Sequence, residues 1–377
     1  MIKNYFKIAL RNIQRNKVYS FINIAGLSLG LAAAMLIILY VKDEVSYDRF
    51  QKNVNNIYRI TFTMINKDGS VANKDGITGY LQGPKFTANV PGIQSFVRIQ
   101  NGGVDIKKGT DIRSEEMMKV DSSFFSIFSF PLLSGNPQTC LSNPYSIVLS
   151  EDEAKKQFGT TDAVGKIVML RSDSTFVPYS VTAVAKKCPQ NSSIKFNILL
   201  PFRPSAEDLQ SSENWFNFFL NTFVVLNPKA NVASVENQIQ QFYDRDSKEA
   251  VKMITEKYGD IIGKTKYELE PYAGMHLSKD FPANAGLTDA SNPVYSYILS
   301  GIALFVLLIA CINFVNLTIA RSLKRAKEIG IRKVVGGNRK QLVIQFLGES
   351  FILCLIAFVM ALAIVKLVLP VFNDLSN

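Results

Sequence analysis

Three long apolar runs interrupt an otherwise mixed pattern of hydrophobic and polar positions. They cover residues 21–41, 294–320 and 341–370. Each is long enough to cross a bilayer as a helix, which takes about 20 mostly apolar residues. Residues 42–293 carry the mixed composition of an ordinary water-exposed domain. The pattern predicts an α-helical membrane protein with three spans in this chain and one large inserted domain.

The inserted segment shows both periodicities of a mixed α+β domain. Residues 150–159 begin with a Ser, carry acids in the first turn and end at Gly159, which predicts a short capped helix. The longest helical pattern of this region covers 232–259. The inserted segment 42–293 is long enough to form two subdomains. Alternating or β-rich runs predict strands at residues 56–64, 166–170, 179–185 and 221–226.

The N-terminal segment, residues 1–20, alternates apolar and basic positions, which predicts an amphipathic helix lying on the inner membrane surface. A basic start before an apolar run also fits a cleaved signal peptide. The run is longer than usual for one, and its small residues 32–34 lie inside it. These features favour an uncleaved first span.

The first span contains Gly26 and Gly30 in a G-x-x-x-G spacing. Small residues at this spacing let two membrane helices approach closely. Glycines are also frequent in membrane helices without such a role. The spacing therefore predicts a helix-packing site at Gly26 and Gly30, and the alternative stays open.

Positive charge gathers in two short segments beside the apolar runs. Residues 321–340 hold eight basic side chains against one acid, and the first twenty residues hold five basic side chains and no acid. The segment 42–293 is balanced, so the net charge of +11 arises beside the spans. Because basic residues mark cytosolic ends, we expect a cytosolic N-terminus, a cytosolic segment 321–340, and an extracytoplasmic domain 42–293 with an extracytoplasmic end 371–377.

The basic segment 321–340, which we term the elbow, is predicted to form a short amphipathic helix followed by a tight turn. Its charges fall largely on one helix face, and Gly336 with Gly337 can end that helix. A nucleic-acid surface commonly interleaves aromatic residues for stacking, and this segment has none. We therefore expect no nucleic-acid partner, and we expect membrane lipids to face the apolar runs.

Few residues point to catalysis. His276 is the one histidine, so one chain cannot build a two-His metal site or a relay with a second His. The stretch "GDIIGKT" (259–265) lacks the glycine spacing of a phosphate-binding loop. We predict no catalytic residue and no metal site. Cys140 and Cys188 could pair as a disulfide in an oxidising compartment, and two free thiols are the favoured alternative.

The spans hold few polar side chains. Asn313 and Asn316 lie in the second, and Glu349 lies in the third about two turns from its cytosolic end. Ionisable groups within spans are costly and often functional. Pairing of Glu349 with a basic residue of the elbow is the favoured interpretation. The aromatic residues at 215–223 could line an apolar site, but a core strand or subdomain contact is favoured.

Several stretches in this order resemble the FtsX-like, MacB-type permease subunits of ABC transporters, in the form common in Bacteroidetes-type bacteria. They are "FINIAGLSLGLA" (21–32), "DEVSYDRF" (43–50), "FFSIFSFPLLSGNP" (124–137), "SIVLSEDEAKKQFG" (146–159), "HLSKD" (276–280) and "ACINFVNLTIARSLKRAKEIGIRKVVGG" (310–337). The resemblance covers nearly the whole chain.

The resemblance implies a non-catalytic permease in a bacterial inner membrane that relays ATP-driven motion of a cytosolic ATPase to its periplasmic domain. It implies no cofactor in this chain, with ATP and Mg²⁺ on the partner ATPase. The ATPase would contact a segment of the elbow that contains Arg325, Glu328, Gly330, Arg332, Lys333 and Gly336.

A second permease unit, forming a dimer or pseudo-dimer, is also implied. Export or extraction of a lipoprotein, peptide or drug would add a periplasmic adaptor and an outer-membrane channel. The alternative is a signalling subunit that senses peptides or controls a cell-wall hydrolase through the same relay. A membrane-anchored enzyme is a third, weaker alternative. Family members have a fourth span after the third, so we expect a truncated chain or half-unit.

Overall fold

The computed structural model describes residues 11, 17–172, 174–258, 263–287, 291–324, 331 and 339–376. It divides into two units. Met1–Glu44 together with Pro293–Asn377 form the first, which we term the membrane unit. Val45–Asn292 form the second, which we term the outer unit. The sequence pattern predicts an inserted domain over 42–293.

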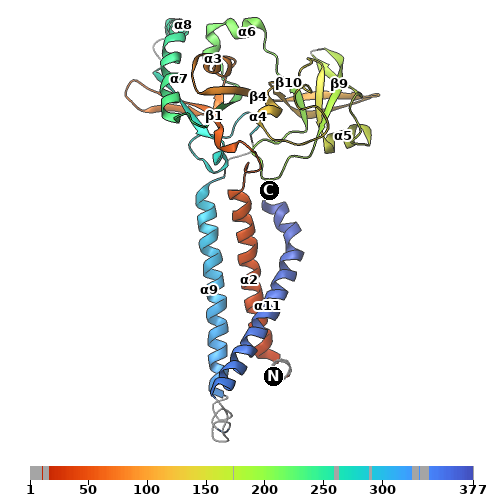
Figure 1. The fold of residues 1–377 in the computed structure, drawn as a ribbon, viewed down its shortest axis with the longest axis vertical. Helices are drawn as coiled ribbons and strands as arrows, with labels where there is room; N and C mark the ends of the chain where they lie inside the picture. The colour runs from red at the N-terminus through yellow and green to blue at the C-terminus, as the bar shows by residue number, and fades with distance from the viewer. Residues whose placement is uncertain are drawn as a thin grey trace. The chain divides into compact units, whose positions relative to one another are not determined.

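The membrane unit contains three long helices: α2 (Lys17–Val45), α9 (Pro293–Lys324) and α11 (Arg339–Ser376) (Figure 1). Each includes a stretch long and apolar enough to cross a membrane. At about 1.5 Å per residue, each exceeds the roughly 30 Å of a hydrocarbon core, so the helices run past the apolar runs at both ends. Residues 17–20, expected in the amphipathic segment, are the first turn of α2.

The outer unit is built from short helices and one sheet (Figure 1). Its helices are α3 (Gln82–Asn89), α4 (Phe124–Ile127), α5 (Glu151–Phe158), α6 (Ala206–Gln210), α7 (Val232–Asp246) and α8 (Lys248–Tyr258), with 3-10 turns η1 (Val54–Asn56), η2 (Ser212–Trp215) and η3 (Met275–Leu277). Its strands are β1 (Ile57–Ile65), β2 (Val71–Asp75), β3 (Ile77–Thr78), β4 (Ile93–Lys108), β5 (Asp111–Val120), β6 (Leu132–Gly135), β7 (Ser146–Ser150), β8 (Ile167–Ser172), β9 (Thr175–Ala185), β10 (Ile198–Pro201), β11 (Leu220–Leu226) and β12 (Lys264–Pro271).

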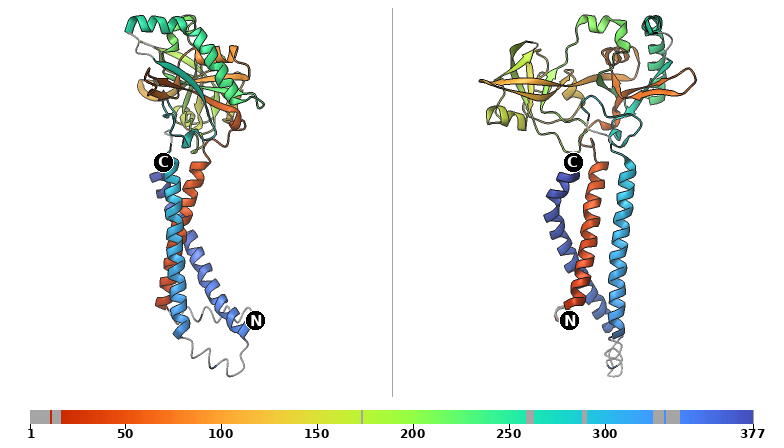
Figure 2. Two further views of the ribbon diagram at one scale, coloured as in Figure 1. Left: turned by 90° about the vertical axis from the view of Figure 1, so that its left-hand side faces the viewer. Right: turned by 180° about the vertical axis from the view of Figure 1, so that it is seen from behind.

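In the described residues these strands form one twelve-stranded sheet with the order β12-β1-β11-β4-β5-β10-β7-β9-β6. The long strand β4 belongs to two parts of it. Its first half pairs with β11, and its second half pairs with β8. Because β8 also pairs with β9, the strands β4, β5, β10, β7, β9 and β8 close a ring of pairings. Figures 1 and 2 show α7 and α8 at one end of the outer unit and α5 at the other.

Buried side chains form three clusters along this sheet. One lies under α3 and α7 and includes Trp215 and Phe86. One lies within the ring and includes Ile106 and Leu170. The third is rich in phenylalanine and includes Phe128 and Phe223. The aromatic run at 215–223 therefore contributes to core packing, as the sequence favoured.

Local sequence explains the helix ends. The Ser150 hydroxyl accepts a hydrogen bond from the Glu153 amide, and Gly159 ends α5 with φ of 72°, a left-handed value that glycine adopts freely. The predicted helix 232–259 is instead two helices. It breaks at Ser247, whose hydroxyl donates to the Tyr243 carbonyl at 2.7 Å. Side-chain hydrogen bonds of this kind compete with helix continuation.

Candidate functional site

Gly26 and Gly30 face α9. A Cβ atom built on Gly30 would lie 2.6 Å from the Ala310 Cβ, and one on Gly26 would lie 3.3 Å from the Asn313 Nδ2. Two turns further down, the Tyr19 and Thr318 hydroxyls are 3.1 Å apart. The described helices α2 and α9 thus approach closely along a line of small residues, within one chain.

The polar residues of the spans take different positions. Asn313 and Asn316 are exposed on α9, and Glu349 is half-buried on α11. Asn23 on α2, which the sequence pattern did not indicate, is only 2% exposed, and its amide has no hydrogen-bond partner among the described residues. A buried amide in this condition is costly in a membrane helix.

The six residues expected to contact an ATPase lie outside the described residues. Of the elbow, the structure describes residues 321–324 at the end of α9, residue 331, and residues 339–340 at the start of α11. Most of the expected amphipathic segment 1–20 also lies outside them.

Within the outer unit, a cluster of hydrogen bonds holds the segment that follows α2. The Asn191 side-chain amide donates to the Ser46 carbonyl at 3.2 Å and to its hydroxyl at 2.9 Å. The Asp48 amide donates in turn to the Asn191 carbonyl at 2.9 Å. Asp48 is buried and has a φ of 59°, so its side chain turns into the domain. We term Ser46, Tyr47 and Asp48 the junction segment.

The Asp48 carboxylate is the centre of this cluster. Its Oδ1 accepts from the Ser193 amide at 2.9 Å and from the Tyr272 hydroxyl at 2.8 Å. Burial raises the pKa of Asp48, and the hydrogen bonds from Ser193 and Tyr272 offset part of that rise. Burial and the neighbouring Asp48 raise the pKa of Tyr272 far above its ordinary value, so its hydroxyl stays protonated and donates.

The segment that leads to α9 reaches the same place. Tyr47 stacks on His276 with ring centroids 3.4 Å apart and planes 4° apart. The His276 carbonyl accepts a hydrogen bond from the Ser291 amide at 2.6 Å. The turn η3 therefore contacts the chain just after the first span and just before the second.

A buried ion pair holds the loop between η3 and α9. Arg59 on β1 and Glu270 on β12 are 2.6 Å apart, with their side chains 1% and 6% exposed. The Arg59 guanidinium also donates to the Pro282 carbonyl at 3.1 Å. Gly76 lies so close to this guanidinium that any side chain there would collide with it. The pair thus fixes the start of the chain segment that continues into the second membrane helix.

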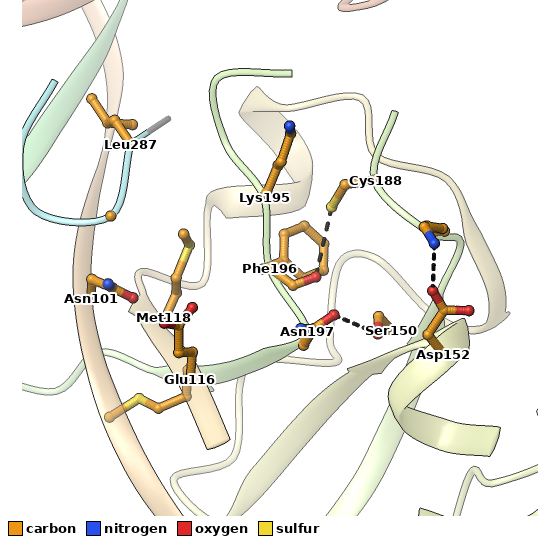
Figure 3. Close-up of a pocket in the computed structure, with 13 residues that line it drawn as sticks. Asn101, Glu116, Met118, Ser150, Asp152, Cys188, Lys195, Phe196, Asn197 and Leu287 are labelled. Atoms are coloured by element: carbon orange, nitrogen blue, oxygen red, sulfur yellow. Dashed lines mark hydrogen bonds and ion pairs between the residues drawn. The ribbon is translucent and has the colours of Figure 1, made fainter. Parts of the chain in front are cut away.

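Next to this loop the outer unit has a half-open cavity of about 450 Å³ (Figure 3). Its floor is apolar and includes Met118 and Phe196, both buried. Charged side chains lie around it. The lining residues are Asn101, Glu116, Met117, Met118, Ser150, Asp152, Lys187, Cys188, Lys195, Phe196, Asn197, Gly286 and Leu287.

Both regions of the chain match known family models. Residues 20–242, more than half of the chain, match the MacB-like periplasmic core domain, and residues 300–377 match the FtsX-like permease C-terminal region. The chain belongs to the family of FtsX-like permeases with a MacB-like periplasmic core domain. The first match includes most of α2 and the outer unit as far as residue 242, and the second includes most of α9 and all of α11.

Relatives of this permease are ABC transporter proteins. The macrolide export ATP-binding/permease protein MacB of Chromobacterium violaceum is 21% identical over 95% of the chain and 51% of its own length. The uncharacterized ABC transporter permease YknZ of Bacillus subtilis is 26% identical over 58% of the chain and 47% of its own length. The chain thus spans about half the length of these curated relatives.

A solved structure supports the fold of the outer unit. It is a crystal structure of a domain, described as that of a permease protein, from Porphyromonas gingivalis. It is 19% identical, covers 59% of this chain and 91% of its own, and has a TM-score of 0.50. At this identity the likeness concerns the fold alone.

The permease has free thiols at Cys140 and Cys188. Burial raises the pKa of the Cys140 thiol to about 11 and also raises the pKa of the Cys188 thiol. Within the described ranges, no three His, Cys, Asp or Glu side chains gather as metal ligands.

The sequence pattern drew attention to Gly26 and Gly30 but gave no indication of the junction. The junction joins residues 46–48, 191–193 and 272–276, which are far apart in the chain. One signal was present: the stretches "DEVSYDRF" and "HLSKD", which carry the family resemblance, contain Tyr47 and His276. Their pairing in space was not indicated by either stretch alone.

Proposed function

We propose that the chain is the non-catalytic permease subunit of an ABC transporter and relays ATP-driven motion of a separate cytosolic ATPase to its outer unit. ATP binding closes the ATPase pair, the elbow shifts, and α2 and α9 carry the shift to the junction. ATP and Mg²⁺ bind the partner in this scheme. The outer unit then acts on a substrate that is already outside the cytosol.

The junction is the observation that carries this proposal. The chain leaving α2 and the chain entering α9 both contact η3, through the Tyr47 ring and the Ser291 amide. Asp48 adds buried hydrogen bonds to the first of these contacts. Directional bonds between buried groups resist displacement, so movement of either helix end is transferred to the domain.

The composition of the spans favours a role in relaying motion and not a role as a polar channel. Asn313 and Asn316 are exposed on α9, whereas Glu349 lies on a different helix, α11. A polar path across a bilayer needs several ionisable or polar groups facing one interior. Small apolar contacts such as Gly30 against Ala310 instead suit helices that move against one another.

For cargo we propose export or extraction of a lipoprotein, a peptide or a drug. Macrolide export, the activity for which the MacB relatives are named, supports the last of these. The scheme places the chain in a bacterial inner membrane with its N-terminus cytosolic and its outer unit periplasmic. A second permease unit, a periplasmic adaptor and an outer-membrane channel complete it.

The test is a crosslinked pull-down of the full-length protein from its own membranes, with partners identified by mass spectrometry. We expect an ABC ATPase to be recovered with the native chain. Glu328→Arg and Arg332→Glu should each lower that recovery, since both reverse a charge of the elbow. Lys108→Glu, at the exposed end of β4, is the matched charge reversal and should leave recovery unchanged.

Equal recovery of the ATPase with all three variants would contradict the coupling role of the elbow. If no ATPase is recovered, even with crosslinks introduced in the elbow, the proposed relay has no source of energy and the proposal is wrong. The co-purified outer partners separate the two readings of the family: an adaptor or outer-membrane channel supports export, whereas a cell-wall hydrolase or sensor kinase supports regulation.

A further inference from the structure

The cavity of the outer unit lies between the loop 186–197 and the segment 286–287. One wall is the loop 186–197, which contributes Cys188, Lys195 and Phe196. The opposite wall contains Gly286 and Leu287, a few residues before α9. An isolated β-bridge between Ile194 and Leu287 joins the two walls. Residues of both walls line the same cavity.

Each wall contacts or continues into a chain segment that leads to a membrane helix. The loop 186–197 supplies Asn191 and Ser193, which bind the junction segment after α2. The other wall is held by Asn221, whose side-chain amide donates to the Asn284 carbonyl at 2.8 Å, and continues into α9. The cavity thus lies where a change in the spacing of the two segments would alter its width.

The charges around the cavity define a ligand. Lys187 and Asp152 form an ion pair of 2.9 Å and so neutralise each other. Glu116 and Lys195 also line the cavity, and within the described residues neither side chain has a hydrogen-bond or ion-pair partner. Figure 3 shows them at opposite edges of the lining, with Met118 and Phe196 between them. One free anion and one free cation flank an apolar floor.

We propose that this cavity binds a small amphipathic zwitterion, with the terminal chemistry of a short apolar peptide. Its ammonium group pairs with Glu116, its carboxylate pairs with Lys195, and its apolar body covers Met118 and Phe196. The volume of about 450 Å³ lies in the range of roughly 300–1,000 Å³ that small-ligand sites occupy. Transmission of this binding to the spans rests on the proposed relay, whereas the binding itself does not.

Binding is tested by calorimetric titration of the purified full chain with the free-ended tripeptide Leu-Phe-Leu. We expect saturable binding, and weaker binding by about three- to tenfold in Glu116→Gln and in Lys195→Gln, because each loses one charge-assisted contact. Asp111→Asn and Lys108→Gln remove equivalent exposed charges at the other end of the β4–β5 hairpin, outside the lining. They should bind as the native chain does.

Two altered ligands separate the parts of the proposal. The tripeptide with acetylated and amidated ends should lose affinity, and Gly-Gly-Gly with free ends should not bind. Equal binding of the blocked tripeptide would assign the cavity to uncharged apolar ligands and overturn the zwitterion. No saturable binding of Leu-Phe-Leu, or affinities unchanged in both Glu116→Gln and Lys195→Gln, would overturn the site itself.

A measurement on the native chain does not depend on any variant. Leu-Phe-Leu should slow labelling of Cys188 by a thiol reagent and should raise hydrogen-exchange protection in 186–197 and 284–287. Unchanged labelling and exchange under saturating ligand would contradict the placement. None of these readouts uses an ATPase, so failure here leaves the recovery experiment unaffected, and failure of ATPase recovery leaves the binding result standing.

Discussion

Different kinds of contact stabilise the interior of the outer unit and the interior of the membrane unit. In the outer unit, buried charges meet directional partners: Arg59 pairs with Glu270, and Arg98 pairs with Asp121 at 2.8 Å. In the membrane unit, the described helices meet through small side chains, such as Ala310 against Gly30 and the buried Ala361 beside Ala32. A directional bond breaks when its groups shift, whereas small surfaces can slide. The outer unit is thus suited to move as one body, and the membrane helices to shift against one another.

The largest expected effect comes from breaking the buried ion pair of the outer unit. Arg59→Ala leaves the Glu270 charge buried without its partner, which costs about 3–5 kcal/mol. We expect a corresponding loss in the free energy of unfolding, measured by urea denaturation of the full chain in detergent. Lys74→Ala removes an exposed pair with Asp280 at 3.6 Å and should cost only about 0–1 kcal/mol. Similar losses for both variants would contradict the role of the buried ion pair in stabilising the outer unit.

An intermediate effect is expected from crowding the helix contact of the membrane unit. Gly30→Leu places a large side chain against Ala310 and should destabilise the packing of α2 on α9 by about 1–3 kcal/mol. Crosslinking between engineered cysteines on these two helices should fall. Gly301→Leu on α9 is the matched control, since a Cβ there meets nothing within 4 Å. If Gly30→Leu crosslinks like the native chain, the close approach of α2 and α9 is wrong.

The smallest effect is a change in pH dependence at the junction. The pKa of Asp48 is raised on folding by burial, so its contribution to stability is fully present below its ordinary value of 3.8 and is lost as pH rises through the raised pKa. Asp48→Asn keeps the Oδ1 acceptor and tolerates the left-handed backbone. Its unfolding free energy relative to the native chain should therefore increase as pH rises from below 3.8 toward neutrality.

Denaturation of both proteins over that pH range gives the comparison. A difference that stays constant with pH would contradict a raised pKa at Asp48. Asp48→Ala serves as the opposite control, because it removes the acceptor for Ser193 and Tyr272 and should lose stability at every pH.

The sequence predicted the elements whose signals are local. The apolar runs located α2, α9 and α11, and the alternating run at 56–64 located β1 within one residue. Strand β4 was not predicted, and it contains Gly102 and Gly103, a residue type that is depleted in strands. In the fold these glycines lie within a continuous ladder with β5, and the Met117 side chain passes within 3.1 Å of where a Cβ on Gly102 would lie.

The closure of the ring could not be predicted either. It depends on two pairs between β4 and β8, Ile106 with Leu170 and Lys107 with Met169, whose register is set by the packed core. The cavity is a product of the same tertiary arrangement, since its lining comes from segments spread between residues 101 and 287. The predicted packing site at Gly26 and Gly30 rests, by contrast, on spacing within one helix, which is a local signal.

Trp215 is the single tryptophan of the chain, and it lies fully buried in the outer unit, with its indole nitrogen donating to the Asp246 carboxylate at 3.1 Å. Indole emission from the intact protein therefore has one source, and the long apolar helices contribute none. The permease carries its own optical reporter. A red shift in that emission signals exposure of the outer core to water, even while the remainder of the chain stays in lipid.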